Sequence, residues 1–270
     1  MTVSAWLDAQ HQGPELRRWL WHPLVYAALN QGPDEAAARP FVRVLGEMFG
    51  PRPEDSAMGL PVVPLDDLIA TPAVQLIESR GGTLLSRRPA KIVTGNDRLQ
   101  HVKVGDTIVR AGVVVSAVPW HAFHALWDEM PPRALAEISA NATAMKSSPI
   151  VTVNLWFDRD VMGGHRVIGL ADGTMHWFFG RQAITGQGMH VSAVTSGAVD
   201  ILRLENDEIV ARALEDARRA LPSAERATLE RAVVVREPRA GFSLAPGSPD
   251  RPGPITPLPG FFLAGDWTDT

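Results

Sequence analysis

The chain has 270 residues, a formal net charge of −4 and a hydrophobic fraction of 45%, so it holds enough apolar material for one large domain or two smaller ones. Lysine and arginine are spread along the sequence, which leaves no basic footprint for nucleic acid. The absence of cysteine excludes disulfides, thiolate metal sites and a cysteine nucleophile. No apolar run approaches the roughly 18 residues of a membrane span, and the start has no signal-peptide pattern. We expect a cytoplasmic protein and leave peripheral contact with the inner membrane face open.

Residues 1–60 are expected to be helical. Leu16, Trp19 and Leu20 recur at helical spacing, and the stretch from Phe41 to Met48 repeats the pattern.

Residues 61–119 differ from the preceding segment in their predicted secondary structure. A helix is expected from about Leu65 to Ser79, ending at Gly81-Gly82. Short β-branched pieces separated by turn residues then predict a β-meander, and the expected strands are Thr83–Leu85, Lys91–Val93, Gln100–Val104 and Thr107–Val109. The apolar run Val113–Val115 predicts one more strand, which stops at Pro119.

Residues 120–235 predict a mixed sheet with helices. Helices are expected from Trp120 to Met130, from about Ala134, and from Asn206 as N-cap to Pro222. Expected strands are Ile150–Phe157, Val167–Leu170, Met175–Phe179, His190–Thr195 and Arg231–Val235. In the first of these, Thr152 and Asn154 alternate with apolar residues, so one face should be less buried.

The chain ends with a strand and a turn. Residues 261–264 form an apolar run, Gly265 marks the turn, and Thr268 and Asp269 supply helix N-cap chemistry. The order of elements predicts a mixed α/β (α+β) fold with two domains, each built from separated segments.

The closing stretch "FFLAGDWTDT", preceded by "RPGPITPLPG", resembles the last flavin-contacting motif of the FAD-dependent amine oxidase and phytoene desaturase superfamily. Within it, the sequence is most similar to the hydroxysqualene dehydroxylases, also called squalene-associated FAD-dependent desaturases. Matching stretches follow in the same order through nearly the whole chain: "TVSAWL", "LWHPLVYAALN", "FVRVLGEMFG", "GLPVVPLDDLI", "IESRGGTLL", "VVVSAVP" and "VNLWFD". The resemblance implies a partial FAD-binding Rossmann-like domain (61–119 and 236–270) interleaved with a helical and mixed-sheet substrate domain (1–60 and 120–235).

The resemblance also implies residues that contact FAD. A turn at the carboxyl end of a buried strand offers backbone N–H groups to a pyrophosphate. The carboxylate of Asp266 would repel a phosphate, and the family pattern assigns it to a hydroxyl of the ribityl chain. The implied cofactor-binding set is Gly265, Asp266, Trp267, Thr268, Ala117, Val118, Pro119 and Ala90.

Each of these assignments has a plainer alternative. Asp266 is also suited to capping a turn, Trp267 to filling a core, and "VVVSAVP" to being an ordinary buried strand stopped by proline. At Ala90, relatives usually carry a valine whose backbone meets the adenine, so this position departs from the family pattern.

The glycine-rich G-x-G-x-x-G turn that opens the superfamily has no counterpart in this sequence. Gly186-Gln187-Gly188 lacks the third glycine, and the helix that follows the final motif in relatives has no counterpart either. We therefore expect an internal piece of a longer flavoprotein, truncated at both ends, which by itself binds FAD weakly or not at all.

Other groups of residues give weaker indications of function. His121, His124 and Asp128 have a spacing that can hold a metal on a helix, but a solvated polar face is the simpler interpretation and no metal site is expected. The eight tryptophans suit core packing as well as a tunnel for an isoprenoid. Asp158, Asp160 and Glu129 are candidates for a catalytic acid only by residue type, so the catalytic residues stay unassigned.

By resemblance, the expected function is that of an FAD-dependent oxidoreductase acting on an apolar, squalene-type polyprenyl, reducing hydroxysqualene to squalene in hopanoid synthesis. The alternatives are a carotenoid desaturase or amine oxidase of the same superfamily, and a non-catalytic binding module that has lost the cofactor. The sequence gives no expectation for the oligomeric state.

Overall fold

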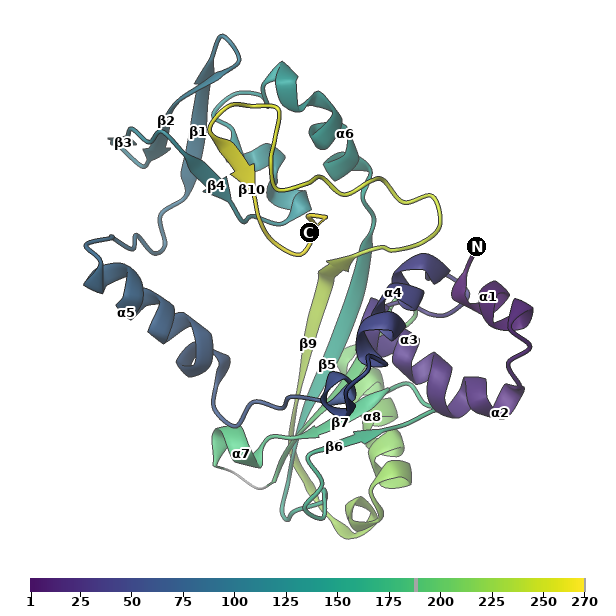
Figure 1. The fold of residues 1–270 in the computed structure, drawn as a ribbon. Helices are drawn as coiled ribbons and strands as arrows, with labels where there is room; N and C mark the ends of the chain where they lie inside the picture. The colour runs from purple at the N-terminus through teal and green to yellow at the C-terminus, as the bar shows by residue number, and fades with distance from the viewer. Residues whose placement is uncertain (187–188, 270) are drawn as a thin grey trace. The chain divides into compact units, whose positions relative to one another are not determined.

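The computed structural model describes residues 1–186 and 189–269 (Figure 1). The chain is of the mixed α/β class and forms two compact units. Unit 1 contains Met1–Leu76 and Ser147–Pro246, and unit 2 contains Ile77–Lys146 and Gly247–Thr270. The chain therefore passes from one unit to the other three times.

Unit 1 is built on a five-stranded sheet in the order β6-β7-β8-β5-β9, in which every neighbouring pair is antiparallel. Its strands are β5 (Ser147–Phe157), β6 (Val167–Gly169), β7 (Trp177–Gly180), β8 (His190–Ser196) and β9 (Leu229–Phe242). The short helix α7 (Gln182–Thr185) follows β7. These strands confirm the expected ones to within a few residues, except that β9 continues well past Val235.

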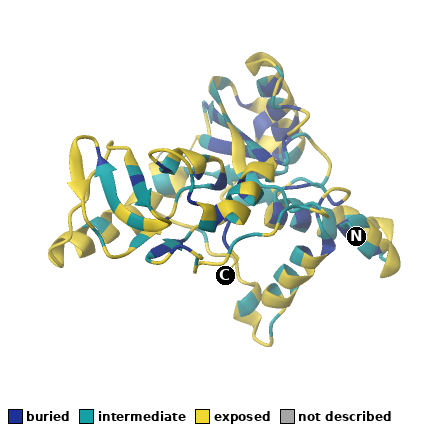
Figure 2. Ribbon diagram, turned by 90° about the horizontal axis from the view of Figure 1, so that it is seen from above, coloured by how far each residue is buried: buried dark blue, intermediate teal, exposed yellow. Residues whose placement is uncertain are grey.

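The two faces of this sheet differ as the alternation in β5 predicts. Val151, Val153 and Leu155 are fully buried, while Thr152 and Asn154 between them are only half-buried (Figure 2). The apolar face packs against α8 (Asn206–Ala220), whose inward stripe recurs at helical spacing. Burial of these side chains supplies the main stabilisation of unit 1.

The start of α8 differs from the expectation that Asn206 is its N-cap. Glu205 occupies the N-cap position with an extended backbone, and Asn206 is the first helical residue. The side chain of Asn206 accepts a hydrogen bond from the Arg236 guanidinium at 2.5 Å. The asparagine oxygen is thus engaged by β9 and does not cap the helix.

The helical prediction for residues 1–60 is confirmed. The segments are α1 (Val3–Ala9), α2 (Pro14–Leu16), the π-helical turn η1 (Arg17–Trp21), α3 (His22–Leu29), α4 (Ala38–Met48) and the 3₁₀ turn η2 (Pro53–Ser56). Their apolar stripes meet in a small cluster that includes Val3, Leu7 and Phe41. These helices therefore have a core of their own inside unit 1.

Asn30 joins the end of α3 to the sheet. It adopts a left-handed backbone with φ of 53° at the C-cap position, which asparagine tolerates better than most residues. Its amide nitrogen donates to the Ser148 carbonyl at 3.0 Å, its side-chain oxygen accepts from the Gly197 N–H at 3.0 Å, and its own carbonyl accepts from the Ser148 hydroxyl. One side chain thereby fixes α3 to the first residues of β5 and the end of β8.

Unit 2 contains the expected β-meander, formed by β1 (Ala90–Gly95), β2 (Arg98–Val104) and β3 (Thr107–Val109). Before it, the π-helical turn η3 (Asp66–Ala70) and α5 (Thr71–Ser79) form the predicted helix, which crosses the boundary between the units. It ends as expected at Gly81, which has φ of 79°, and Gly82, whose N–H donates to the Ile77 carbonyl at 2.9 Å. The strand expected at Thr83–Leu85 was wrong: these residues are exposed and lie in no strand.

The helix expected from Trp120 to Met130 was also wrong. This stretch forms two 3₁₀ turns, η4 (Trp120–Ala122) and η5 (His124–Leu126). Trp127 then becomes extended and bridges to Ile92, and the next N–H, of Asp128, donates to the Ile92 carbonyl at 3.0 Å. Pairing with β1 replaces the helical hydrogen bonds that would have continued the segment.

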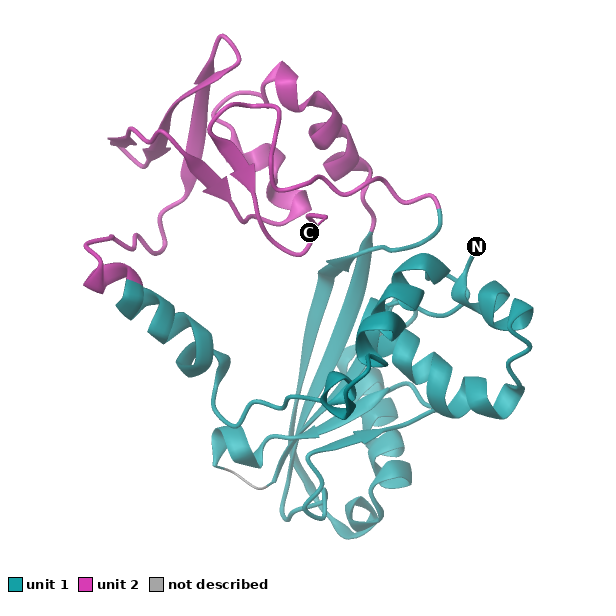
Figure 3. Ribbon diagram, viewed as in Figure 1, with its two compact units in different colours: residues 1–76, 147–246 teal, residues 77–146, 247–270 magenta. Residues whose placement is uncertain are grey.

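The helix expected from about Ala134 is present as η6 (Arg133–Leu135) and α6 (Ala136–Ala144). It belongs to unit 2, where the Asn141 side chain donates to the Asp250 carbonyl at 3.1 Å and His124 contacts the Thr143 hydroxyl at 2.8 Å. The boundary after α6 falls between residues 146 and 147, and the others between 76 and 77 and between 246 and 247 (Figure 3). Each lies further along the chain than the expected boundaries after residues 60, 119 and 235.

Two further observations complete the fold. The Gly186-Gln187-Gly188 stretch lies partly outside the described residues. No helix in the described part of the chain is long and apolar enough to cross a bilayer.

Replacing Asn30 should destabilise unit 1. Asn30→Ala removes two hydrogen bonds and places alanine in a left-handed conformation, so the free energy of unfolding should fall by about 2–4 kcal/mol in urea denaturation. Asn96→Ala is the matched control, since Asn96 also has a positive φ of 52° but sits in an exposed turn. Equal losses in the two variants would contradict the linking role of Asn30.

His176 should make stability depend on pH. Burial lowers the pKa of His176 from 6.5 to about 4, against a weaker opposing effect of the Asp216 carboxylate, and its Nδ1 accepts a hydrogen bond from the Ser196 N–H at 3.2 Å. Below pH 6.5 the unfolded chain binds a proton that the folded protein refuses until about pH 4. This contribution is complete above pH 6.5 and is lost as the pH falls towards 4, by about 3 kcal/mol in all.

The measurement is urea denaturation at a series of pH values from 7.5 to about 4.5. His176→Asn keeps an acceptor for the Ser196 N–H but cannot titrate, so its stability should fall less steeply with acid than that of the unmodified protein. His165→Asn, at an exposed histidine, is the control and should keep the original slope. Parallel curves for the unmodified protein and His176→Asn would refute this origin of the pH dependence.

Candidate functional site

The closing strand pairs with the "VVVSAVP" strand. β10 (Phe261–Leu263) lies parallel to β4 (Val114–Ser116), with Phe261 opposite Val114 and Leu263 opposite Ser116. The Ala264 N–H extends the ladder by donating to the Ser116 carbonyl at 2.8 Å. Because the strands are parallel, their carboxyl ends meet at one edge of this two-stranded sheet (Figure 1). Two expected binding segments, residues 117–119 and 265–268, therefore lie side by side.

The turn after β10 presents unused backbone donors. Gly265 has φ of 113°, a conformation that strains any residue with a Cβ. Within the described residues, the N–H groups of Gly265, Asp266 and Trp267 donate to no acceptor. Gly265 and Asp266 are exposed. Consecutive free N–H groups at the end of a strand form a concavity suited to an anion such as a phosphate.

Trp267 and Thr268 hold this turn in place. The Trp267 indole N–H donates to the Val118 carbonyl at 3.0 Å, and the ring is fully buried, with its edge against Phe123 at 5.7 Å between centroids. The Thr268 hydroxyl donates to the Gly265 carbonyl at 2.7 Å. Both side chains thus bond to the backbone of the site and fix the turn against the end of β4.

Asp266 is the acidic side chain of the turn. In the described structure its carboxylate has neither a hydrogen bond nor an ion pair, whereas the neighbouring Asp269 pairs with Arg251 at 2.8 Å. An exposed, unpaired carboxylate can accept hydrogen bonds from ligand hydroxyls.

The remaining expected site residues lie in two places. Pro119 is half-buried and caps η4, directly after the Ala117–Val118 segment. Ala90 is the exposed first residue of β1, where it pairs with Val104 in the three-stranded sheet, and not in the sheet of β4 and β10.

Ser116 was missed from the sequence. It is buried, and its hydroxyl has no hydrogen-bond partner in the described part of the chain. A buried polar group without a partner is costly, so a ligand atom at this edge would be a favourable partner. The signal was present, since Ser116 is the one polar residue in "VVVSAVP".

These groups fit FAD, the cofactor that the sequence implies. The free N–H groups after β10 suit its phosphates, the Asp266 carboxylate suits its hydroxyls, and Gly265 leaves the surface free of a side chain. The edge where β4 and β10 end therefore has the donors and the acceptor that such a nucleotide requires.

The acid candidates are not equally suited to protonating a leaving group. Asp158 pairs with Arg159 at 2.8 Å and accepts the Thr228 N–H at 2.9 Å, and the hydrogen bond from Arg159 is the main reason that its pKa falls to about 2. A carboxylate that stays ionised in this way is a poor acid at neutral pH. Asp160 accepts the Met162 N–H at 2.9 Å, and Glu129 is exposed.

The histidines considered for a metal do not converge. His124 Nε2 lies 3.2 Å from the Ser139 carbonyl and 2.8 Å from the Thr143 hydroxyl. Asp128 instead pairs with Lys103 at 2.6 Å, and the hydrogen bond from Lys103 lowers the pKa of the Asp128 carboxyl. Among residues 1–186 and 189–269, no three potential ligands are grouped around a point where a metal could bind.

Known proteins match this chain in sequence and in fold. Residues 55–270 match the family "Flavin containing amine oxidoreductase". A hydroxysqualene dehydroxylase of Sinorhizobium fredii is 30% identical over 264 residues, which are 94% of this chain and 58% of the relative. A probable zeta-carotene desaturase of Synechococcus elongatus is 24% identical over 96% of this chain and 60% of its own length. The chain thus spans about three fifths of these relatives.

An oxidoreductase from Methanosarcina mazei has the same fold, with a TM-score of 0.77 at 18% identity over 99% of this chain and 63% of that one. The family match extends over most of the sequence and includes both segments that meet at the ends of β4 and β10. The chain therefore belongs to the family of flavin-containing amine oxidoreductases.

Proposed function

We propose that this chain supplies part of the FAD site and the substrate region of an oxidoreductase that reduces hydroxysqualene to squalene. The observation that carries the cofactor assignment is the parallel pairing of β10 with β4, which sets the free N–H groups of residues 265–267 beside Ala117 and Val118. The identity of 30% to a hydroxysqualene dehydroxylase, over 94% of this chain, supports the substrate.

In this proposal, the N–H groups of the exposed Gly265 and Asp266 bind a phosphate of FAD, and the Asp266 carboxylate accepts a hydrogen bond from a ribityl hydroxyl. Trp267 and Thr268 are positioning residues, since their polar atoms are already bonded to Val118 and Gly265. Ala117, Val118 and Pro119 line the neighbouring segment. The backbone of Ala90 meets the adenine only if β1 contributes to the same site.

The chemistry that reduced FAD supplies is hydride transfer, here to the allylic carbon whose hydroxyl group leaves. The chain's own contribution is to hold the nucleotide, orient it through a rigid turn and exclude water. The leaving hydroxyl needs a proton, and Asp158 is the least suitable of the acid candidates because its pKa is about 2.

A second candidate is carotenoid desaturation. The probable zeta-carotene desaturase is 24% identical over 96% of this chain, and such a reaction removes hydrogen from its polyprenyl and does not reduce it. Both candidates share an apolar substrate and the same cofactor, so they differ in the direction of electron flow. Contact with a membrane surface, where such substrates reside, is part of the proposal in either case.

The direct test uses the complete gene product that contains this sequence. With reduced flavin and hydroxysqualene we expect squalene to form, detected by gas chromatography and mass spectrometry, and with oxidised flavin and phytoene we expect no new double bonds. Asp106→Ala, in an exposed turn of the meander, is the control for the Asp266 variants described next. Desaturated phytoene without any squalene would reverse the order of the two candidates.

Asp266→Ala should weaken FAD binding with little effect on folding. Losing one hydrogen bond from a charged acceptor should raise the dissociation constant about tenfold or more, measured by quenching of flavin fluorescence. The melting temperature of the protein without flavin should stay the same, because Asp266 is exposed and unpaired. Asp266→Asn keeps an acceptor oxygen and should recover most of the affinity. FAD binding by Asp266→Ala as tight as that of Asp106→Ala would refute the role.

A further inference from the structure

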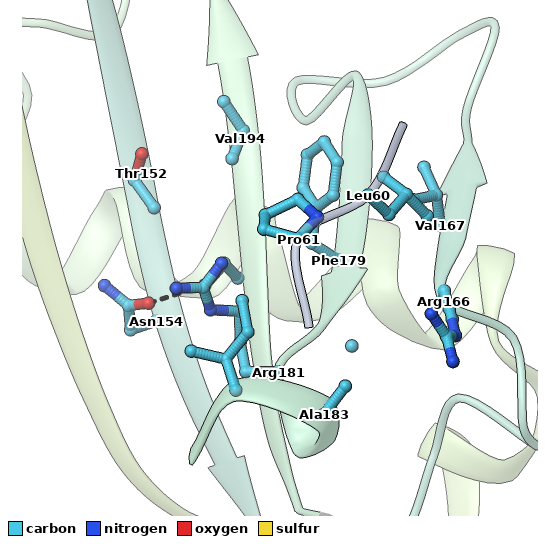
Figure 4. Close-up of a pocket in the computed structure, with 13 residues that line it drawn as sticks. Leu60, Pro61, Thr152, Asn154, Arg166, Val167, Phe179, Arg181, Ala183 and Val194 are labelled. Carbon is cyan, nitrogen blue, oxygen red and sulfur yellow. Dashed lines mark hydrogen bonds between the residues drawn. The ribbon is translucent and has the colours of Figure 1, made fainter. Parts of the chain in front are cut away.

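A cavity lies within unit 1, on the face of the sheet that α8 does not cover. It has a volume of about 440 Å³, which is within the range of small-molecule sites. Thr152, Asn154 and Ser192 form its floor, Arg166 and Arg181 line it, and the Leu60–Pro61 segment contributes from outside the sheet (Figure 4). All of these residues belong to unit 1, whereas the turn after β10 belongs to unit 2.

The floor of the cavity is organised by hydrogen bonds across β5 and β8. The Asn154 side-chain oxygen accepts from the Ser192 hydroxyl at 2.8 Å and lies 3.0 Å from His190 Nε2. Because the Asn154 oxygen is held as an acceptor, the amide nitrogen of the same side chain is left as a donor. Within the described residues that nitrogen has no acceptor. The Thr152 hydroxyl likewise has no hydrogen bond there. The floor therefore offers polar groups that the protein itself does not use.

The charged groups of the cavity are all of one sign. Arg166 and Arg181 lie on either side of Ala183 in Figure 4, and no acidic residue is part of the lining. In the part of the chain that the structure describes, neither arginine forms an ion pair, and Arg181 Nε is buried without a hydrogen-bond partner. Elsewhere in unit 1, arginines such as Arg17, Arg212 and Arg219 pair with carboxylates.

The charge of Arg181 also acts on a neighbouring histidine. His190 lies beside Arg181, and its pKa is lowered first by burial and then by the charge of that arginine. The His190 ring stacks on the Trp156 ring at 4.3 Å between centroids, and the Arg231 guanidinium lies over the same Trp156 ring at 4.8 Å. Unpaired guanidinium groups that line a cavity, one of them with a buried and unpartnered Nε, are suited to an anion.

The rest of the lining is apolar and comes from Leu60, Pro61, Val167, Phe179, Ile184 and Val194. We propose that this cavity binds a small organic anion, with its phosphate or carboxylate group between Arg166 and Arg181 and its hydrocarbon part against the apolar residues. The proposal goes beyond the proposed function, because it requires neither FAD nor a polyprenyl substrate.

The test is isothermal titration calorimetry of the 270-residue chain with four probes: hexyl phosphate, hexanoate, 1-hexanol and inorganic phosphate. Hexyl phosphate or hexanoate should bind, and the tighter of the two identifies the head group. Hexanol should bind at least about tenfold more weakly, since it lacks the charge that the arginines would pair with. Inorganic phosphate should also bind more weakly, since it lacks the apolar part.

Arg181→Gln should weaken binding of the preferred anion about tenfold or more and leave the weak binding of hexanol unchanged. Arg218→Gln, at an exposed arginine of α8 on the opposite side of the sheet, makes the same change in charge and should keep the original affinity. Melting temperatures of the two variants show whether each is folded. Equal affinities in the two variants, hexanol binding as tightly as the anions, or no binding of either anion would each overturn the proposal.

Discussion

The parallel pairing of β10 with β4 is the constraint on which the candidate cofactor site depends. It joins residues 261–263 to residues 114–116, two segments that are distant in sequence and neither of which forms a site alone. The ladder sets the register, and the bond from the Trp267 indole to the Val118 carbonyl then holds the two strand ends at a fixed separation. Free N–H groups and a bare glycine are useful to a nucleotide only when they are held still.

Local patterns in the sequence predicted those elements whose burial follows a simple period. The alternation in β5, the stripe of α8 and the turn residues of the meander each point to one structure, and the tertiary contacts agree with it. Prediction failed where a contact from elsewhere competed with the local preference. Residues 120–130 have a helical composition, but Trp127 and Asp128 pair with Ile92 of β1, and no local pattern reveals that partner.

Burial was harder to predict than secondary structure. The helix over residues 65–79 was expected and is present, yet its apolar residues Leu68, Ile69 and Leu76 are all more than half exposed. Periodicity shows that a helix has an apolar stripe, but what covers the stripe depends on the rest of the fold. The same limit applies to Asn30, whose place in "LWHPLVYAALN" gave no sign that its side chain would join α3 to two strands.

The candidate site shows the same division. The strand, the turn and the position of Gly265 follow from composition, whereas the free N–H groups, the buried hydroxyl of Ser116 and the inward position of Trp267 depend on register and packing. The two interpretations of Trp267 are compatible, because a side chain that fills the core also fixes the backbone that faces the ligand. The unpaired arginines of the cavity in unit 1 directly precede β6 and directly follow β7, and only the antiparallel pairing of these strands brings the two positions to one end of the sheet.

The three passages of the chain between the units have a genetic consequence. Neither unit corresponds to one continuous stretch of the gene, so a single cut cannot separate one from the other without leaving both incomplete. Ser147 pairs with Phe242 at the same end of the sheet, which brings two of the passages close together in space. Residues 147–246 thus resemble an insertion whose two ends lie close together. Recombination could remove or exchange this segment and join its flanks by a short bridge, leaving the reading frame of the surrounding polypeptide intact.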